Sequence, residues 1–152
     1  MKAVIQRVSR ASVSVDGKVY GSVERGYMIL LGVEKEDTKK QAELLAQKTA
    51  NLRIFCDQND KMNLSLLDVD GGALVISQFT LCANTKKGNR PFFEYAMEPQ
   101  GANDLYEYYC DCLQGCGVKC VQKGVFGAHM EVELVNDGPV TICLDTDTWR
   151  KD

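Results

Sequence analysis

The sequence predicts an α+β domain in which two helices cover a mostly antiparallel curved sheet or half-barrel. The first third of the chain alternates between apolar and polar residues, as half-buried strands do. Two later segments repeat apolar residues at helical spacing, and short strand-like segments lie between and after them. The order strands, helix, strands, helix, strands is typical of an α+β domain. Tight turns between neighbouring strands favour antiparallel pairing.

The strands are expected in two groups, separated by the first helix. Asp16-Gly17 is a hairpin signal, because both residues tolerate positive φ. Two continuous apolar runs, 27–33 and 73–76, predict buried central strands. The full set of predicted strands is 3–8, 11–15, 19–23, 27–33, 53–56, 73–76, 118–122, 129–135 and 140–144.

Two helices are expected. The first should follow Thr38, which is a plausible N-cap, and should end near Arg53. The second should run from Gly101 to Gln114 and end at the glycines that follow. Since the sequence contains no repeat or linker, residues 1–152 are expected to form a single domain.

Charge and hydropathy limit the partners. The net charge of −3 argues against coating long nucleic acids, DNA included, because such binding depends on neutralising many phosphates. A small basic patch can still grip a few nucleotides at an RNA end, although on charge alone a solvated surface is favoured. The start of the chain carries charges within its apolar stretch, and no apolar run is long enough to span a bilayer, so a cytoplasmic protein without membrane contact is expected. Two basic patches are candidates: Lys2, Arg7 and Arg10, and Lys86, Lys87 and Arg90.

The seven cysteines are expected to be reduced and structural. Four of them crowd together as Cys110, Cys112, Cys116 and Cys120, but their spacing is not that of a zinc site. A small metal-binding protein built on this cluster is therefore a minor alternative. The one histidine, His129, falls in a predicted strand, where a structural role is favoured. Phosphate-loop, dinucleotide-binding and HExxH motifs are absent, and we expect no cofactor and no metal.

Two short segments are candidates for chemistry. SQFTL at 77–81 follows the buried strand 73–76, and polar groups at such a strand end must be satisfied or used. NDGPVT at 136–141 holds a Gly-Pro pair between two predicted strands. On local sequence a hairpin with Asx-type turn chemistry is favoured there. The functional alternative is a cis X-Pro bond that aims adjacent carbonyls in an unusual direction.

Taken together, SQFTL and NDGPVT resemble the two signature motifs of the D-aminoacyl-tRNA deacylases. Four further segments are similar to this family: MKAVIQRV at 1–8, LLGVEKED at 30–37, KMNLSL at 61–66 and NTKKGNRP at 84–91. The resemblance implies a homodimer in which a cis Gly138-Pro139 peptide completes the partner's active site. Arg7 would orient that peptide, and Asn136 would support it. L-amino acids would be rejected by main-chain atoms, whereas D-amino acids and glycine, including glycyl-tRNA(Ala), would be accepted.

The resemblance also implies how the ester between the amino acid and the tRNA 3′ acceptor end is cleaved. Backbone N–H groups near Gln78 and Phe79 would stabilise the oxyanion, and Ser77 would support their loop. Thr80 lacks a visible base, so we assign it to positioning and expect the substrate's 2′-hydroxyl to assist the water. The basic residues of 84–91 would meet acceptor-end phosphates, and Ala128 and His129 would line the adenosine or amino-acid pocket. The alternative is a non-catalytic RNA-end or nucleotide-binding module of the same fold.

Overall fold

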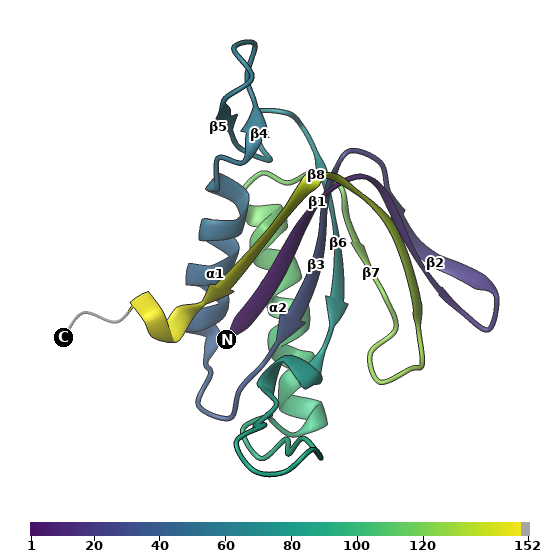
Figure 1. The fold of residues 1–152 in the computed structure, drawn as a ribbon, viewed down its shortest axis with the longest axis vertical. Coiled ribbons are helices and arrows are strands. Elements are labelled where there is room, and N and C mark those ends of the chain that lie inside the picture. Colours follow the sequence, from purple (N-terminus) through teal and green to yellow (C-terminus); the bar gives the residue numbers. More distant parts are fainter. Residues whose placement is uncertain (150–152) are drawn as a thin grey trace.

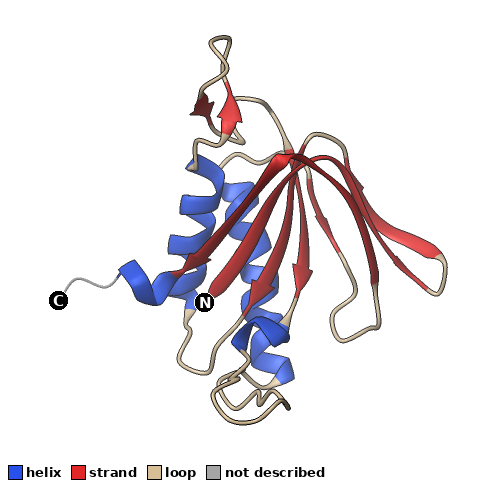
Figure 2. Ribbon diagram, viewed as in Figure 1, coloured by secondary structure: helices blue, strands red, loops and turns tan. Residues whose placement is uncertain are grey.

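The computed structural model describes residues 1–149, so residues 150–152 of the predicted single domain and its tail lie outside the described part. Two helices, α1 and α2, lie side by side against one face of a strongly curved sheet (Figure 1). The sheet bends away from the helices, so that β2 and the first part of β8 lie far from them (Figure 1, Figure 2). The last part of β8 returns to the helix side, where Val140, Ile142 and Leu144 pack against the core. The predicted α+β half-barrel covered by two helices is confirmed.

The first strand, β1 (Lys2–Val15), organises the sheet. Its first half pairs with β3 (Gly26–Gly32) and its second half with β2 (Lys18–Val23), both antiparallel. On its other side it pairs along its length with β8 (Glu131–Asp145). The two strands predicted over 3–8 and 11–15 are therefore one, and the Asp16-Gly17 turn with positive φ is confirmed.

The centre of the sheet is parallel rather than antiparallel. β3 pairs in parallel with β6 (Gly72–Ser77), which pairs in parallel with β7 (Val121–Lys123). The order is β2-β1-β3-β6-β7, with β8 beside β1. Parallel strands are usually buried on both faces, which explains why β3 and β6 are continuous apolar runs. A separate two-stranded sheet, β4 (Phe55–Cys56) with β5 (Met62–Leu64), was not fully predicted, because β5 is too short to show alternation.

Helix boundaries follow from their caps. α1 (Lys39–Asn51) begins at the predicted N-cap Thr38, which forms a reciprocal capping box with Gln41. α2 (Pro99–Gly115) begins earlier than expected, because the Glu98 carboxylate accepts the first N–H groups and Pro99 favours the first helical position. Short 3-10 helices, η1 (Phe79–Cys82) and η2 (Thr146–Trp149), follow β6 and β8. Among residues 1–149 neither helix is both long and apolar enough to cross a bilayer.

Two apolar clusters hold these layers together, one on each face of the sheet. The larger lies between the sheet and the helices and includes Tyr27, Leu45 and Tyr109, all fully buried. Burying side chains of this size contributes roughly 1.5–3 kcal/mol each. The smaller lies inside the curve of the half-barrel, where Ile76 and Met130 extend it toward the end of β6. Because the inner face is only partly filled, it leaves room for a cavity at that end.

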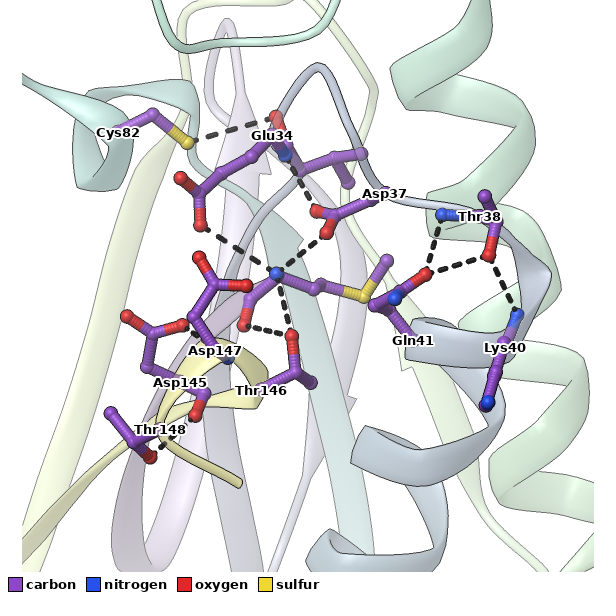
Figure 3. Close-up of polar contacts among 12 residues, drawn as sticks. Glu34, Asp37, Thr38, Lys40, Gln41, Cys82, Asp145, Thr146, Asp147 and Thr148 are labelled. Carbon is purple, nitrogen blue, oxygen red and sulfur yellow. Dashed lines mark hydrogen bonds and ion pairs between the residues drawn. The ribbon is translucent and has the colours of Figure 1, made fainter. Parts of the chain in front are cut away.

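The chain begins in a buried ion cluster (Figure 3). The Met1 ammonium group donates to Asp37 Oδ1 at 2.8 Å and to Thr146 Oγ1 at 2.9 Å, and it lies 3.6 Å from Glu34 Oε1. The Thr146 N–H in turn donates to the Met1 carbonyl. One positive charge thus joins three segments: the start of β1, the loop before α1 and the start of η2.

Candidate functional site

A cavity of about 590 Å³ opens where β6 ends. Ser77, Gln78 and Phe79 of the first motif line it, as does Phe93, whose ring lies edge-on to that of Phe79 with centroids 4.9 Å apart. The opposite wall includes His129 and its neighbours just before β8. His129 therefore lies in a loop at the cavity and not inside a strand as predicted. Among residues 1–149 the lining carries no carboxylate or lysine, so the groups that can act on a ligand here are the His129 imidazole, amides, hydroxyls and aromatic rings.

The first motif places the N-terminus of η1 at this cavity. The Gln78 N–H donates to the Leu31 carbonyl at 2.8 Å, which continues the pairing of β6 with β3. The Leu81 N–H then donates to the Gln78 carbonyl and closes the first turn. Since the first N–H groups of a helix have no acceptor within it, those of Phe79 and Thr80 remain as donors. Of the N–H groups near Gln78 and Phe79 that are expected to face the oxyanion, that of Gln78 therefore already has an acceptor in the sheet, whereas that of Phe79 has none within η1.

Within the described residues, the Thr80 hydroxyl forms one side-chain hydrogen bond. Its hydroxyl accepts a hydrogen bond from the Gln78 side-chain amide. Within residues 1–149, no carboxylate, imidazole or amine forms a hydrogen bond with this hydroxyl. An amide cannot take up a proton at neutral pH, so the contact orients Thr80 without activating it as a nucleophile.

The second motif is not the hairpin turn favoured from local sequence. Val8 of β1 pairs with Asn136, and Gln6 pairs with Thr141, so β8 continues along the same neighbour on both sides of the motif. The intervening residues bulge out of one long strand. The Gly138-Pro139 peptide bond is cis, and both residues are exposed. Both strands predicted around the motif exist, but they are two halves of β8.

Asn136 closes the base of this bulge. Its Oδ1 accepts the Val140 N–H at 2.7 Å, and its Nδ2 donates to the Val140 carbonyl at 3.1 Å. The side-chain amide thus pairs with the Val140 backbone as a neighbouring strand would. The predicted Asn chemistry is present, although it supports a bulge and not a turn between separate strands.

Arg7 binds the backbone at the start of the bulge. It is only 8% exposed, so the surface-arginine alternative is wrong. Its Nε donates to the Asp137 carbonyl at 2.9 Å, and its Nη1 donates to the Ile54 carbonyl at 2.7 Å. A Cβ added at Gly138 would lie 2.8 Å from Val140 Cγ2 and 3.1 Å from Arg7 Nη2, at a φ of 144°. Only glycine fits this position without strain.

The two motifs do not meet within one chain. No residue of 136–141 lines the cavity at the first motif. In the sheet, β8 is separated from β6 by β1 and β3. The Gly-Pro bulge is therefore exposed to solvent outside its own cavity.

A basic loop links two walls of the cavity. An antiparallel bridge between Asn84 and Phe92 closes the loop, in which Lys86, Lys87 and Arg90 are all exposed. The other predicted basic patch does not hold together in this way, because Arg7 is buried within it.

The cysteine cluster does not form a group of metal ligands. Cys110 is buried in α2, where desolvation raises the pKa of its thiol to about 12, whereas Cys120 is exposed beyond the helix. Over the described range 1–149, the closely spaced group of potential ligands comprises Glu34, Asp145 and Asp147, which lie around the Met1 ammonium cluster.

Residues 4–145, which include both motifs, match the family model described as D-Tyr-tRNA(Tyr) deacylase. The chain belongs to the D-Tyr-tRNA(Tyr) deacylase family. It is 54% identical to the D-aminoacyl-tRNA deacylase of Koribacter versatilis over 146 residues, which cover 96% of this chain and 97% of the relative. It is 56% identical to that of Roseiflexus castenholzii over 151 residues, covering 99% and 96%.

Solved structures share the deacylase family fold. The c-Myc DNA unwinding element binding protein matches with a TM-score of 0.90 at 42% identity, covering 95% of this chain and 98% of its own. A probable eukaryotic D-amino acid tRNA deacylase matches with a TM-score of 0.82 over 94% and 97%. At 15% identity this second likeness concerns the fold alone.

Proposed function

We propose that this chain hydrolyses the ester bond of D-aminoacyl-tRNA and releases the free D-amino acid and tRNA. Family membership supports this activity, since relatives that share more than half of its residues bear that name. The observation that carries the proposal is the start of η1 at a cavity whose lining has no carboxylate or lysine. Such a site can stabilise an oxyanion with backbone donors while water performs the attack.

In the proposed reaction, a water oxygen attacks the ester carbonyl carbon, and the carbonyl oxygen becomes an oxyanion. The N–H groups of Phe79 and Thr80 would donate to it, because Gln78 is already paired with Leu31. The substrate's own 2′-hydroxyl would help to orient the water, and would accept the water's proton while it passes its own proton to the 3′ ribose oxygen. Collapse breaks the bond to the ribose oxygen, which leaves with a proton. Ser77 would support the loop.

Selection of the D-enantiomer would come from a second copy of the chain. The Gly138-Pro139 tip is exposed, is held at its base by Arg7 and Asn136, and does not line the cavity of its own protomer. We propose a homodimer in which each tip enters the partner's cavity. Its carbonyls would occupy the side where an L side chain projects, so that L-esters are rejected by exclusion. Glycine has nothing to exclude, so glycyl-tRNA(Ala) would also be hydrolysed.

The test is separate incubation of D-tyrosyl-tRNA and L-tyrosyl-tRNA with the purified protein. Loss of the D-ester alone is the expected outcome. Equal loss of both esters would contradict the chirality filter, and loss of neither would indicate a non-catalytic RNA-end-binding module. Because charged tRNA is found there, the cytoplasm is the proposed site of action.

Thr80→Ala tests the positioning role of Thr80. The variant should retain substantial single-turnover hydrolysis of D-tyrosyl-tRNA, within about tenfold of the parent, because no base activates this hydroxyl. Thr85→Ala, on the exposed loop that follows, is the matched control. A fall of Thr80→Ala to the uncatalysed rate would restore the nucleophile model.

A further inference from the structure

The short strand β4 is joined to the Gly-Pro bulge through one side chain. Arg7 lies between them and forms hydrogen bonds on both sides. Its Nε donates to the Asp137 carbonyl in the bulge at 2.9 Å. On the other side, its Nη1 donates to the Ile54 carbonyl at 2.7 Å and to Cys56 Sγ at 3.7 Å. Three segments that are far apart in the sequence therefore meet at one guanidinium group.

Packing against the core fixes β4 beside Arg7. The Phe55 ring is buried and stacks on that of Tyr27, with centroids 5.3 Å apart. Tyr27 belongs to β3 and lies opposite Arg7 in the pairing of β3 with β1. The Arg25 guanidinium lies 5.4 Å from the centroid of the Phe55 ring. These contacts hold the acceptors of β4 in place for Arg7.

The turn that follows β4 is closed by Asp57. Its Oδ1 accepts the N–H groups of Asn59 and Lys61 at 2.8 and 3.1 Å. The Asp57 N–H also donates to the Lys61 carbonyl at 2.8 Å. Because Phe55 is fixed in the core and Asp57 is fixed in this turn, the backbone of Cys56 is held from both neighbours.

The guanidinium group links the orientation of β4 to that of the tip. Its Nε faces the bulge, and a Cβ built on Gly138 would lie 3.1 Å from its Nη2. Nη1 faces β4. Since a guanidinium group is planar and rigid, acceptors on one side fix the direction of the donors on the other. Loss of an acceptor on the β4 side would therefore let the group rotate and shift the Asp137 carbonyl and Gly138.

We infer that β4 supports the Gly-Pro tip and that Cys56 is a positioning residue for the chirality filter, acting through Arg7. This inference rests on the proposed deacylase function. The Ile54 acceptor belongs to the backbone, so a side-chain substitution leaves it in place, whereas the Sγ contact depends on the residue at position 56. A thiol sulfur is a weak acceptor, so its loss should remove part of the rate and selectivity.

The test compares Cys56→Val with Cys56→Thr. These side chains have nearly the same shape and both suit a strand, but only threonine keeps an acceptor. At equal concentration of folded protein, kcat/KM of Cys56→Val for D-tyrosyl-tRNA should fall about three- to tenfold. Its preference for the D-ester over the L-ester should fall as well, because a displaced tip excludes an L side chain less completely. Cys56→Thr should lie within about twofold of the parent in both respects, as should the control Cys120→Val, at an exposed thiol beyond α2.

A double-variant cycle separates an effect through Arg7 from a general loss of packing. If Cys56 acts through Arg7, adding Cys56→Val to Arg7→Ala should leave the rate of Arg7→Ala unchanged. Losses that multiply in the double variant would overturn the inference. Equal losses in Cys56→Val and Cys56→Thr would also overturn it, as would an unchanged preference for the D-ester in folded Cys56→Val.

Solvent exchange of the Arg7 Nε–H, followed by ¹⁵N NMR, tests the contact without catalysis. Exchange should be about threefold faster or more in Cys56→Val than in the parent or Cys120→Val, because a guanidinium group with fewer acceptors opens more often. Unchanged exchange would contradict the support of the tip by β4. If the parent cleaves neither ester while exchange still responds at Cys56, the proposed function fails and the support of the tip by β4 stands.

Discussion

Two buried cations lie six residues apart, Met1 directly before β1 and Arg7 within it, and they have different roles. The Met1 ammonium group faces carboxylates, with Asp37 at 2.8 Å and Glu34 at 3.6 Å. The Arg7 guanidinium faces backbone carbonyls, those of Asp137 and Ile54. Its closest carboxylate oxygen, at 3.9 Å, belongs to the side chain of Asp137, which is largely exposed.

The difference lies in what each charge controls. A cation surrounded by carboxylates is neutralised, and its removal chiefly affects the stability of the fold. A cation that donates to carbonyls in a fork fixes the direction of those carbonyls. We therefore expect changes at the Met1 cluster to alter unfolding, and changes at Arg7 to alter the geometry of the exposed Gly-Pro bulge.

The largest effect should follow Arg7→Ala. Loss of both hydrogen bonds releases the base of the bulge, and a shift of about 1 Å at a positioning element can cost roughly 100-fold in rate. Deacylation of D-tyrosyl-tRNA at equal concentration of folded protein is the measurement. The deacylation rate of Arg7→Lys should lie between those of the parent and Arg7→Ala, because an ammonium group lacks the two-pronged geometry of a guanidinium. Arg10→Ala, at an exposed position, is the control. Full activity of folded Arg7→Ala would contradict the proposal that Arg7, unlike the Met1 ammonium group, controls the geometry of the bulge.

Asp37→Asn changes the Met1 cluster and should lower stability, not deacylation. It keeps the shape of a side chain that is 4% exposed but leaves the buried ammonium without its main counter-charge. The free energy of unfolding in urea should fall by about 3 kcal/mol. Glu36→Gln, which removes a charge from an exposed neighbour, should change it by less than about 0.5 kcal/mol. A large loss of deacylation in fully folded Asp37→Asn would contradict the assignment.

Glu34→Gln should have the smallest effect on the free energy of unfolding. It tests whether desolvation or the Met1 ammonium group dominates at Glu34. Desolvation raises the pKa of Glu34 above its ordinary value, and the Met1 ammonium and Lys2 only partly oppose this. Below the ordinary pKa the carboxyl is protonated in both folded and unfolded states. As pH rises through the raised folded pKa, ionisation costs the folded state and the stability linked to Glu34 is lost.

The stability of the parent should therefore decline relative to Glu34→Gln between pH 4 and neutral pH. Urea unfolding of both proteins across this range is the measurement. A parent that gains stability over the variant as pH rises would show that the ammonium, and not desolvation, dominates at Glu34.

Much of the fold could be predicted because local signals agreed with tertiary structure. The Thr38 cap and the Asp16-Gly17 turn are local, and both are confirmed. The hairpin turn predicted at the Gly-Pro segment was wrong, because a turn signal in sequence cannot show that the strands on either side pair with the same neighbour. The parallel pairing of β3 with β6 also depends on contacts distant in sequence.

The site was predicted only where local sequence signals sufficed. The position of SQFTL after a buried strand indicated polar groups at a strand end, and the cavity is found there. The engaged Gln78 N–H could not be foreseen, because its acceptor, Leu31, belongs to another strand. Periodicity predicts a strand at His129, but the strand begins two residues later, at Glu131, so only the family resemblance indicated its place at the cavity.

The bulge in β8 has a consequence for solubility. Within the described residues β8 pairs with β1 alone, so its other side is an open sheet edge in a strand of 15 residues. A flat edge of that length is a template for open-ended strand addition. Pro139 has no N–H to offer, and the bulge divides the edge into two short stretches on either side of 137–140. The same four-residue interruption that exposes the glycine–proline tip thus guards the isolated protomer against fibre-like stacking.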